Sequence, residues 1–125
     1  MSMAKVIPIT TVKKKITVVF YRNDRGKEPV RDWILGLTAD DKKVIGGDIK
    51  TVEFGWPIGM PVSKPLGGGL YEVRSNLSDG TKARIIFTIQ QDNMVLLHGF
   101  IKKTQKTPKN DIRTARRRAK KFSPK

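Results

Sequence analysis

The stretch LYEVRSNLSDGTKARIIFTIQQDNMVLLHGFIK, residues 70–102, decides the fold because it predicts three consecutive strands. The strand segments are LYEVRS (70–75), ARIIFTIQ (83–90) and MVLLHGFIK (94–102), and polar turn sequences separate them. Strands this close along a chain pair as an antiparallel meander. We therefore expect a sheet whose middle is built from this stretch.

On the N-terminal side, one strand and two helices are expected. KITVVFY, residues 15–21, alternates apolar side chains with period two and predicts a strand. Pro29 suits the first turn of a short helix that ends near Gly36. Thr38 is a suitable N-cap for a second helix that runs to about Phe54.

Glycine and proline set two further expectations. Gly46 and Gly47 lie in the middle of the second predicted helix, where each costs roughly 1 kcal/mol relative to alanine. Either another element packs very close there or the helix is locally weak. Residues 55–69, GWPIGMPVSKPLGGG, are so rich in both residue types that we expect a long loop, and loops of that length often bind a partner.

A basic helix is expected to close the domain. It opens at Pro108 and carries a narrow apolar line formed by Ile112, Ala115, Ala119 and Phe122. The predicted order is β-α-α-β-β-β-α, an α+β fold with a mainly antiparallel sheet packed by helices. Residues 15–122 then form one domain, and residues 1–14 form a mobile N-terminal extension.

Positive charge is concentrated at the C-terminal end. Residues 102–125 hold eleven Lys or Arg and one Asp, a net +10 out of the formal +15 of all 125 residues. A field this concentrated attracts polyanions, so RNA or DNA is favoured over an anionic membrane as the partner. A solvated basic tail without a specific ligand is the alternative.

Composition excludes several other classes. The chain has no cysteine, which rules out disulfides and thiolate metal sites and fits a reducing cytoplasm. No apolar run is long enough to span a bilayer, and no signal peptide is visible, so we expect neither secretion nor a membrane partner. With one histidine, scattered acids and no nucleotide-binding motif, we expect no metal and no cofactor.

Basic residues mark the ends of the three predicted strands and the segment that follows them. They are Arg74, Lys82, Arg84, Lys102 and Lys103, with Lys106 and Lys109 just beyond. In a meander, Arg74 and Arg84 approach each other across a turn. Converging cations stabilise the charge of a pentacoordinate phosphorus, and RNA supplies its own 2′-hydroxyl nucleophile. The pattern therefore favours a metal-free ribonuclease over a deoxyribonuclease.

Each of these basic residues also has a structural interpretation, which the sequence leaves open. Arg74 and Arg84 either bind phosphate or pair with Glu72 or with acids on the helices. Lys102 and Lys103 either bind phosphate or act as solvated charges that block edge pairing.

His98 is a candidate general base, but its surroundings favour another role. Alternation along the strand places it on one face with Met94, Leu96 and Phe100. That position favours a hydrogen-bonded core histidine over a general base.

Three segments carry a family resemblance. They are DIKTVEFGWPIGMP (48–61), PLGGGLYEVRSNLSDGTKARIIF (65–87) and VLLHGFIKKTQKTPKNDIRTAR (95–116). Together they resemble the phage-derived HigB-like branch of the RelE/ParE toxin superfamily. The resemblance implies a RelE-like fold and a type II toxin that cleaves mRNA, typically on the ribosome with its 16S rRNA. It also implies a HigA-like helix-turn-helix antitoxin and a bacterial cytoplasmic location.

The resemblance also assigns roles to residues. Arg84 matches the arginine that contacts the scissile phosphate, Arg74 matches a basic residue on the preceding strand, and Lys103, with Lys102, matches the last strand's cation. The C-terminal helix lacks the tyrosine that often assists catalysis in relatives, which leaves Lys106, His98, the substrate or the ribosome for proton transfer. The residues expected to bind RNA are Lys82, Lys102, Lys106, Lys109, Arg113, Arg116, Arg117 and Lys120.

Two other functions are compatible with the same fold. One is a non-enzymatic nucleic-acid-binding or ribosome-binding module. The other is a ParE-like poison of DNA gyrase.

Overall fold

Residues 15–122 are described by the computed structural model and form eight elements around one sheet; the predicted extension over residues 1–14 lies outside them. In chain order the elements are β1 (Thr17–Phe20), α1 (Pro29–Leu35), α2 (Ala39–Gly55), β2 (Ser63–Gly67), β3 (Leu70–Asn76), β4 (Lys82–Gln90), β5 (Asn93–Lys102) and α3 (Lys109–Lys121). The strand order in the sheet is β1-β5-β4-β3-β2. Only the β1–β5 pair among them is parallel. The α+β prediction and the antiparallel meander are confirmed.

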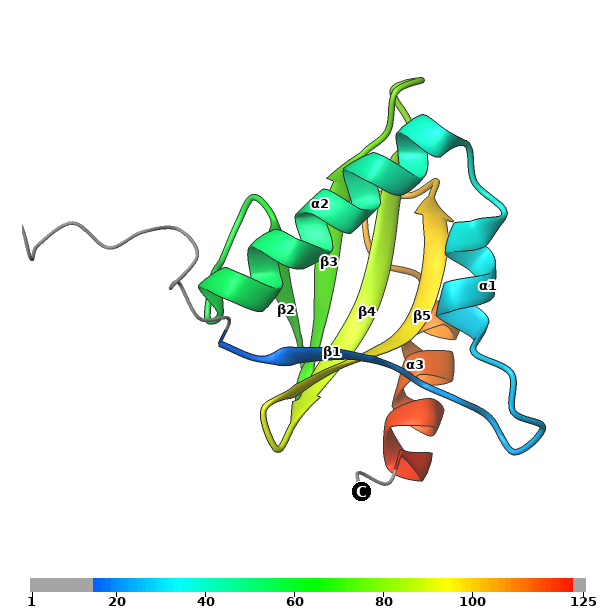
Figure 1. The fold of residues 1–125 in the computed structure, drawn as a ribbon, viewed down its shortest axis with the longest axis vertical. Coiled ribbons are helices and arrows are strands. Elements are labelled where there is room, and N and C mark those ends of the chain that lie inside the picture. The colour runs from blue at the N-terminus through cyan, green and yellow to red at the C-terminus, as the bar shows by residue number, and fades with distance from the viewer. Residues whose placement is uncertain (1–14, 123–125) are drawn as a thin grey trace, which may run out of the picture.

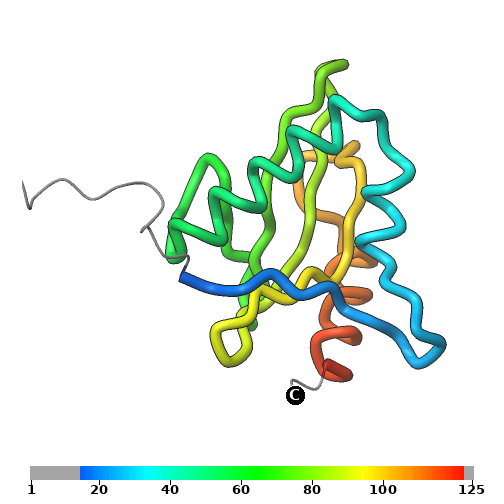
Figure 2. The backbone as a smooth tube through the Cα atoms, in the orientation of Figure 1, coloured from blue at the N-terminus to red at the C-terminus, as the bar shows by residue number. Residues whose placement is uncertain are grey.

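The helices form a layer on each face of the sheet (Figure 1). On one face, Val30 of α1 and Ile45 of α2 belong to the same apolar cluster as Ile85 and Phe87 of β4, and the ribbon in Figure 1 shows α2 lying across this face. On the other, Ala115 of α3 packs in a second apolar cluster with strand residues. Figure 2 shows the same arrangement, with α2 crossing one face and α3 on the opposite one. The predicted apolar line on α3 is confirmed, since its residues bury against this second cluster.

The predicted helix boundaries follow from local chemistry. Pro29 occupies the first turn of α1, where its missing N–H costs nothing. Thr38 caps α2 by accepting a hydrogen bond at 3.2 Å from the Asp41 amide. Of the two alternatives at Gly46 and Gly47, close packing of another element is excluded, because a β-carbon at either position would meet nothing within 4 Å.

The expected loop over residues 55–69 is partly wrong, because it contains β2. This strand pairs antiparallel with β3 at the edge of the sheet, and its register shifts between Pro65 and Gly67. A proline has no amide hydrogen to donate, so an edge position with a bulge is where a strand tolerates it. The observed order is therefore β-α-α-β-β-β-β-α.

Gly99 of β5 is where α1 docks on the sheet. A β-carbon there would lie 2.6 Å from the ring of Trp33. We expect Gly99→Ala to lower the free energy of unfolding by about 1–3 kcal/mol, because the indole and its helix must move. Denaturant unfolding measures this change. The control is Gly46→Ala, where the added methyl meets open space and helix propensity predicts a gain of up to about 1 kcal/mol. Equal effects of the two substitutions would contradict the close packing.

Candidate functional site

The predicted cations gather where β3, β4 and β5 meet the loop that leads to α3. Cross-strand pairing sets Arg74 opposite Arg84 and Lys82 opposite Lys102, which confirms the expected approach of the two arginines. The pocket between them has a volume of about 500 Å³ and is lined by Arg74, Lys82, Arg84, Lys102, Lys103, Thr104 and Gln105. Thr104 and Gln105 were missed because they lie in an irregular loop without a sequence pattern. We call this pocket the cation pocket.

One buried carboxylate holds the two arginines. Glu72 of β3 is 1% exposed, and its Oε2 lies 3.1 Å from Nη1 of Arg74 and 3.7 Å from Nε of Arg84. The Thr107 hydroxyl donates to the other Glu72 oxygen at 2.8 Å. The pairing with Glu72 that the sequence left open therefore exists. Since one carboxylate faces two guanidinium groups, the cation pocket keeps an excess of positive charge.

Arg84 is fixed and incompletely bonded. It is 2% exposed, and its Nη1 donates to the Ala83 carbonyl at 2.9 Å. Its Nε is, within residues 15–122, the one buried side-chain nitrogen or oxygen without a hydrogen-bond partner. Burial, and then the charge of Arg74, lower the pKa of Arg84 from its ordinary value, and Glu72 partly offsets both. An anion in the cation pocket would offset the positive charge that Arg84 and Arg74 place there.

Lys102 is partly buried and lines the cation pocket together with the two arginines. Burial lowers its pKa from the ordinary value for lysine, and the nearby charge of Arg84 lowers it further. Lys103 follows the end of β5 and is exposed, although it also lines the cation pocket. Lys106 is exposed on the loop between β5 and α3.

His98 occupies a different place from the one expected. A register shift between Ile86 and Phe87 of β4 breaks the alternation along β5, so Met94 and Leu96 join the cluster on the α2 face. His98 instead pairs with Asp111 of α3 at 2.6 Å and stacks on Phe100. It does not line the cation pocket. The predicted shared face is wrong for Met94 and Leu96 but confirmed for Phe100. The predicted hydrogen bond of His98 also exists, and it attaches the start of α3 to the sheet.

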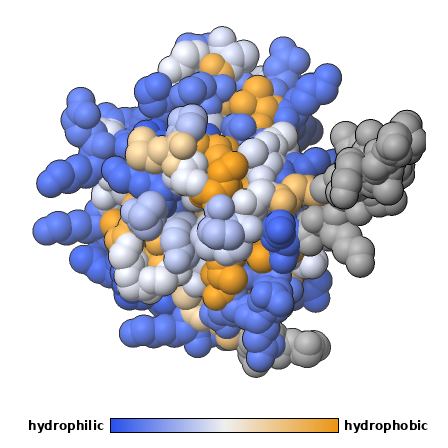
Figure 3. Space-filling model, turned by 90° about the vertical axis from the view of Figure 1, so that its left-hand side faces the viewer, coloured by the Kyte–Doolittle hydropathy of each residue, from blue (hydrophilic) through white to orange (hydrophobic). Residues whose placement is uncertain are grey.

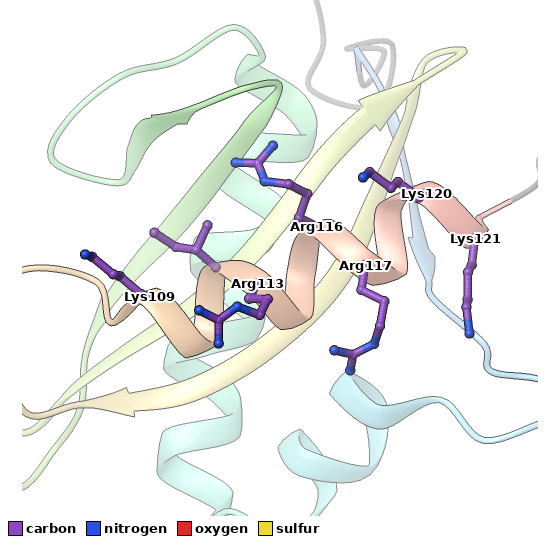
Figure 4. A pocket seen from close by; sticks show the side chains of 7 residues that line it. Lys109, Arg113, Arg116, Arg117, Lys120 and Lys121 are labelled. Atoms are coloured by element: carbon purple, nitrogen blue, oxygen red, sulfur yellow. The ribbon is translucent and has the colours of Figure 1, made fainter.

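The remaining predicted RNA-binding residues form a second basic surface along α3 (Figure 4). An open groove of about 550 Å³ surrounds the partly buried Ile112, and the cations along it are Lys109, Arg113, Arg116, Arg117, Lys120 and Lys121. The Arg116 guanidinium lies against Gly68, where a β-carbon would come within 2.5 Å of its Nη1. This α3 groove and the cation pocket share no lining residue.

Across residues 15–122, no three His, Cys, Asp or Glu side chains are grouped so that they would hold a metal ion. In the same residues, none of the helices combines the length and the apolar character that crossing a membrane requires.

Comparison with known proteins places the chain in a family. Residues 32–120 match the family model described as Phage derived protein Gp49-like (DUF891). No curated protein sequence matches the chain. The match covers well over half of the 125 residues and includes both the cation pocket and most of α3. The chain therefore belongs to the Gp49-like family of phage-derived proteins, a RelE/ParE-like toxin family.

Proposed function

We propose that this protein is the HigB-like toxin of a type II toxin–antitoxin system and that it cleaves messenger RNA on the ribosome, which inhibits translation in the bacterial cytoplasm. Its partners are the message, the 16S rRNA and a HigA-like antitoxin. The observation that carries the proposal is the buried, incompletely bonded Arg84 in a pocket with Arg74 and Lys102. Membership of a toxin family supports it.

The proposed reaction needs no metal ion. The 2′-hydroxyl gives up its proton to solvent water, and its oxygen attacks the adjacent phosphorus. A P–O bond forms and the bond to the 5′-oxygen breaks, which leaves a 2′,3′-cyclic phosphate and, once the 5′-oxygen is protonated, a 5′-hydroxyl. Arg74, Arg84 and Lys103, which all line the cation pocket, stabilise the extra negative charge of the pentacoordinate phosphorus. Lys102 donates a proton to the leaving 5′-oxygen, and its lowered pKa makes it a stronger acid than an ordinary lysine.

The cations of the α3 groove have a different part in the proposal. They bind the RNA backbone away from the scissile link, so they contribute affinity without choosing a sequence. Removing one of these cations should lower the affinity for RNA and make that affinity less dependent on salt concentration. The rate of bond cleavage in bound RNA should stay the same.

The test is incubation with translating ribosomes followed by primer extension of the message, with supercoiled DNA and gyrase assayed in parallel. Cut message supports the proposed ribonuclease. Salt-sensitive binding without cut message would favour a binding module, and DNA breaks with intact message would favour a gyrase poison. Either of these outcomes would overturn the proposal.

Lys102→Arg tests the proton donor. A general acid must be protonated, so wild-type activity should fall as the pH rises through the lowered Lys102 pKa. Arginine keeps the charge but hardly releases a proton, so we expect a rate about tenfold to a hundredfold lower and no alkaline decline in that range. Single-turnover cleavage across pH measures both. His98→Gln, outside the cation pocket, should keep the wild-type alkaline decline, and an identical profile for Lys102→Arg would refute the role.

A further inference from the structure

A second, smaller pocket adjoins the cation pocket on the α2 side. Its volume is about 270 Å³, and it is lined by Val44, Asp48, Pro61, Val62, Arg74 and Asn76. Arg74 lines both pockets, so a ligand bound to its guanidinium on one side has this cavity next to it. The Arg74 amide donates to the Val62 carbonyl at 2.8 Å, which ties the segment before β2 to β3. The position of this wall is therefore set by the sheet.

The walls of this pocket combine apolar surface with one oriented acceptor. Val44, Pro61 and Val62 supply the apolar part. The Ser75 hydroxyl, 3% exposed, donates to Oδ2 of Asp48 at 2.7 Å and so fixes the carboxylate. The other Asp48 oxygen has no hydrogen-bond partner among residues 15–122. Viewed from the β2 side of the sheet, apolar surface gathers in the middle of the molecule inside a hydrophilic surround (Figure 3).

We propose that this pocket binds the base beside the scissile phosphate and that Asp48 selects a base carrying an exocyclic amino group, namely cytosine, adenine or guanine, over uracil. The inference rests on the proposed ribonuclease function and adds a specificity determinant to it. Arg74 then contacts the phosphate on one side and the base on the other.

The chemistry of the four bases supports this choice. Proteins read unpaired RNA bases by enclosing them between apolar or guanidinium surfaces and by hydrogen bonding to their edges. A carboxylate only accepts hydrogen bonds, so it matches an amino group such as cytosine N4. Uracil presents a carbonyl oxygen at the equivalent place, and two acceptors facing each other repel. Because the Ser75 hydroxyl donates to the Asp48 carboxylate, the carboxylate cannot turn away without losing a partly buried hydrogen bond.

Asp48→Asn tests the inference, because an amide keeps the size of the side chain but can donate to a carbonyl oxygen. Messages that differ in one base at the cleavage position are compared by primer extension. We expect the wild type to cleave beside an amino-bearing base at least about tenfold faster than beside uracil. In Asp48→Asn that ratio should shrink to about threefold or less. Asp40→Asn, an exposed acid on the first turn of α2, is the matched control and should keep the wild-type ratio.

The outcomes separate this inference from the proposed function. Equal base preference in the wild type and in Asp48→Asn, with cleavage intact, overturns the inference alone. Absence of cleavage on every message overturns the ribonuclease proposal. In that case fluorescence anisotropy with short oligonucleotides of cytidine or uridine still measures the preference. An equal affinity for both, unchanged in Asp48→Asn, would then refute the base pocket itself.

Discussion

Replacing Glu72 with leucine should lower the free energy of unfolding by about 3–5 kcal/mol. The substitution leaves Arg84, with 3% of its side chain exposed, without the carboxylate that faces it. It also removes the acceptor of the Thr107 hydroxyl and the partner of Arg74. A buried charge without a counter-charge is among the costliest defects a fold can carry, which sets the size of the effect. Denaturant unfolding followed by circular dichroism measures it.

A double variant separates the lost charge pair from lost packing. Glu72→Leu combined with Arg84→Leu removes both charges and should recover most of the stability, because apolar side chains can replace a buried ion pair at little cost. Glu28→Gln is the exposed counterpart, since Glu28 pairs with Arg22 at the surface, and it should cost less than about 1 kcal/mol. If Glu72→Leu and Glu28→Gln lowered the free energy of unfolding by similar amounts, the buried Glu72 carboxylate would not be what stabilises this group of side chains.

Arg84→Ala should reduce RNA cleavage by about a hundredfold to a thousandfold, the usual cost of losing one preorganised donor to a developing negative charge. Among the residues of the cation pocket, we expect Arg84 to contribute most to stabilising this charge, because it is buried and lacks a full set of hydrogen bonds. Arg84→Lys should recover only part of the rate, because an ammonium group lacks the planar fork of donors. Single-turnover cleavage on translating ribosomes gives the comparison.

Arg118→Ala is the matched control for Arg84→Ala. Burial lowers the pKa of Arg118 too. This side chain extends from α3, and its Nη1 donates to the Leu97 carbonyl oxygen at a distance of 2.7 Å. Its loss should lower stability while cleavage stays within a few-fold of wild type. If both alanine variants lost cleavage in proportion to their loss of stability, Arg84 would be a structural residue.

Elements that depend on neighbouring residues could be predicted from the sequence. Elements that depend on pairing between distant segments could not. Pro29, the Thr38 cap and the meander depend on neighbouring residues, so the sequence predicts them well. β2 was missed because residues 55–69 contain too much proline and glycine for a strand of average composition. These residues form a strand because β3 supplies hydrogen-bonding partners for them. Local residue propensities do not reveal such a partner.

The site was predictable to the same extent. The approach of Arg74 and Arg84 follows from the meander, and the sequence names Glu72 as a competing partner. The register shift between β4 and β5 is not visible in the alternation of apolar residues, so His98 was assigned to the wrong face. The sequence does not single out Asp48, the residue proposed to bind a base, because the hydrogen bond that fixes its carboxylate comes from Ser75 in another element.

The parallel pairing of β1 with β5 has a consequence for synthesis. Thr17 is paired with Asn93, so β1 has to wait during synthesis for a strand that is made much later. Contacts of such long sequence separation close slowly, and a nascent chain cannot form them before the later segment emerges. The complete cation pocket also needs Lys102 of the same late strand. Any activity that depends on the cation pocket therefore has to wait until β5 has been made and has paired with its neighbours.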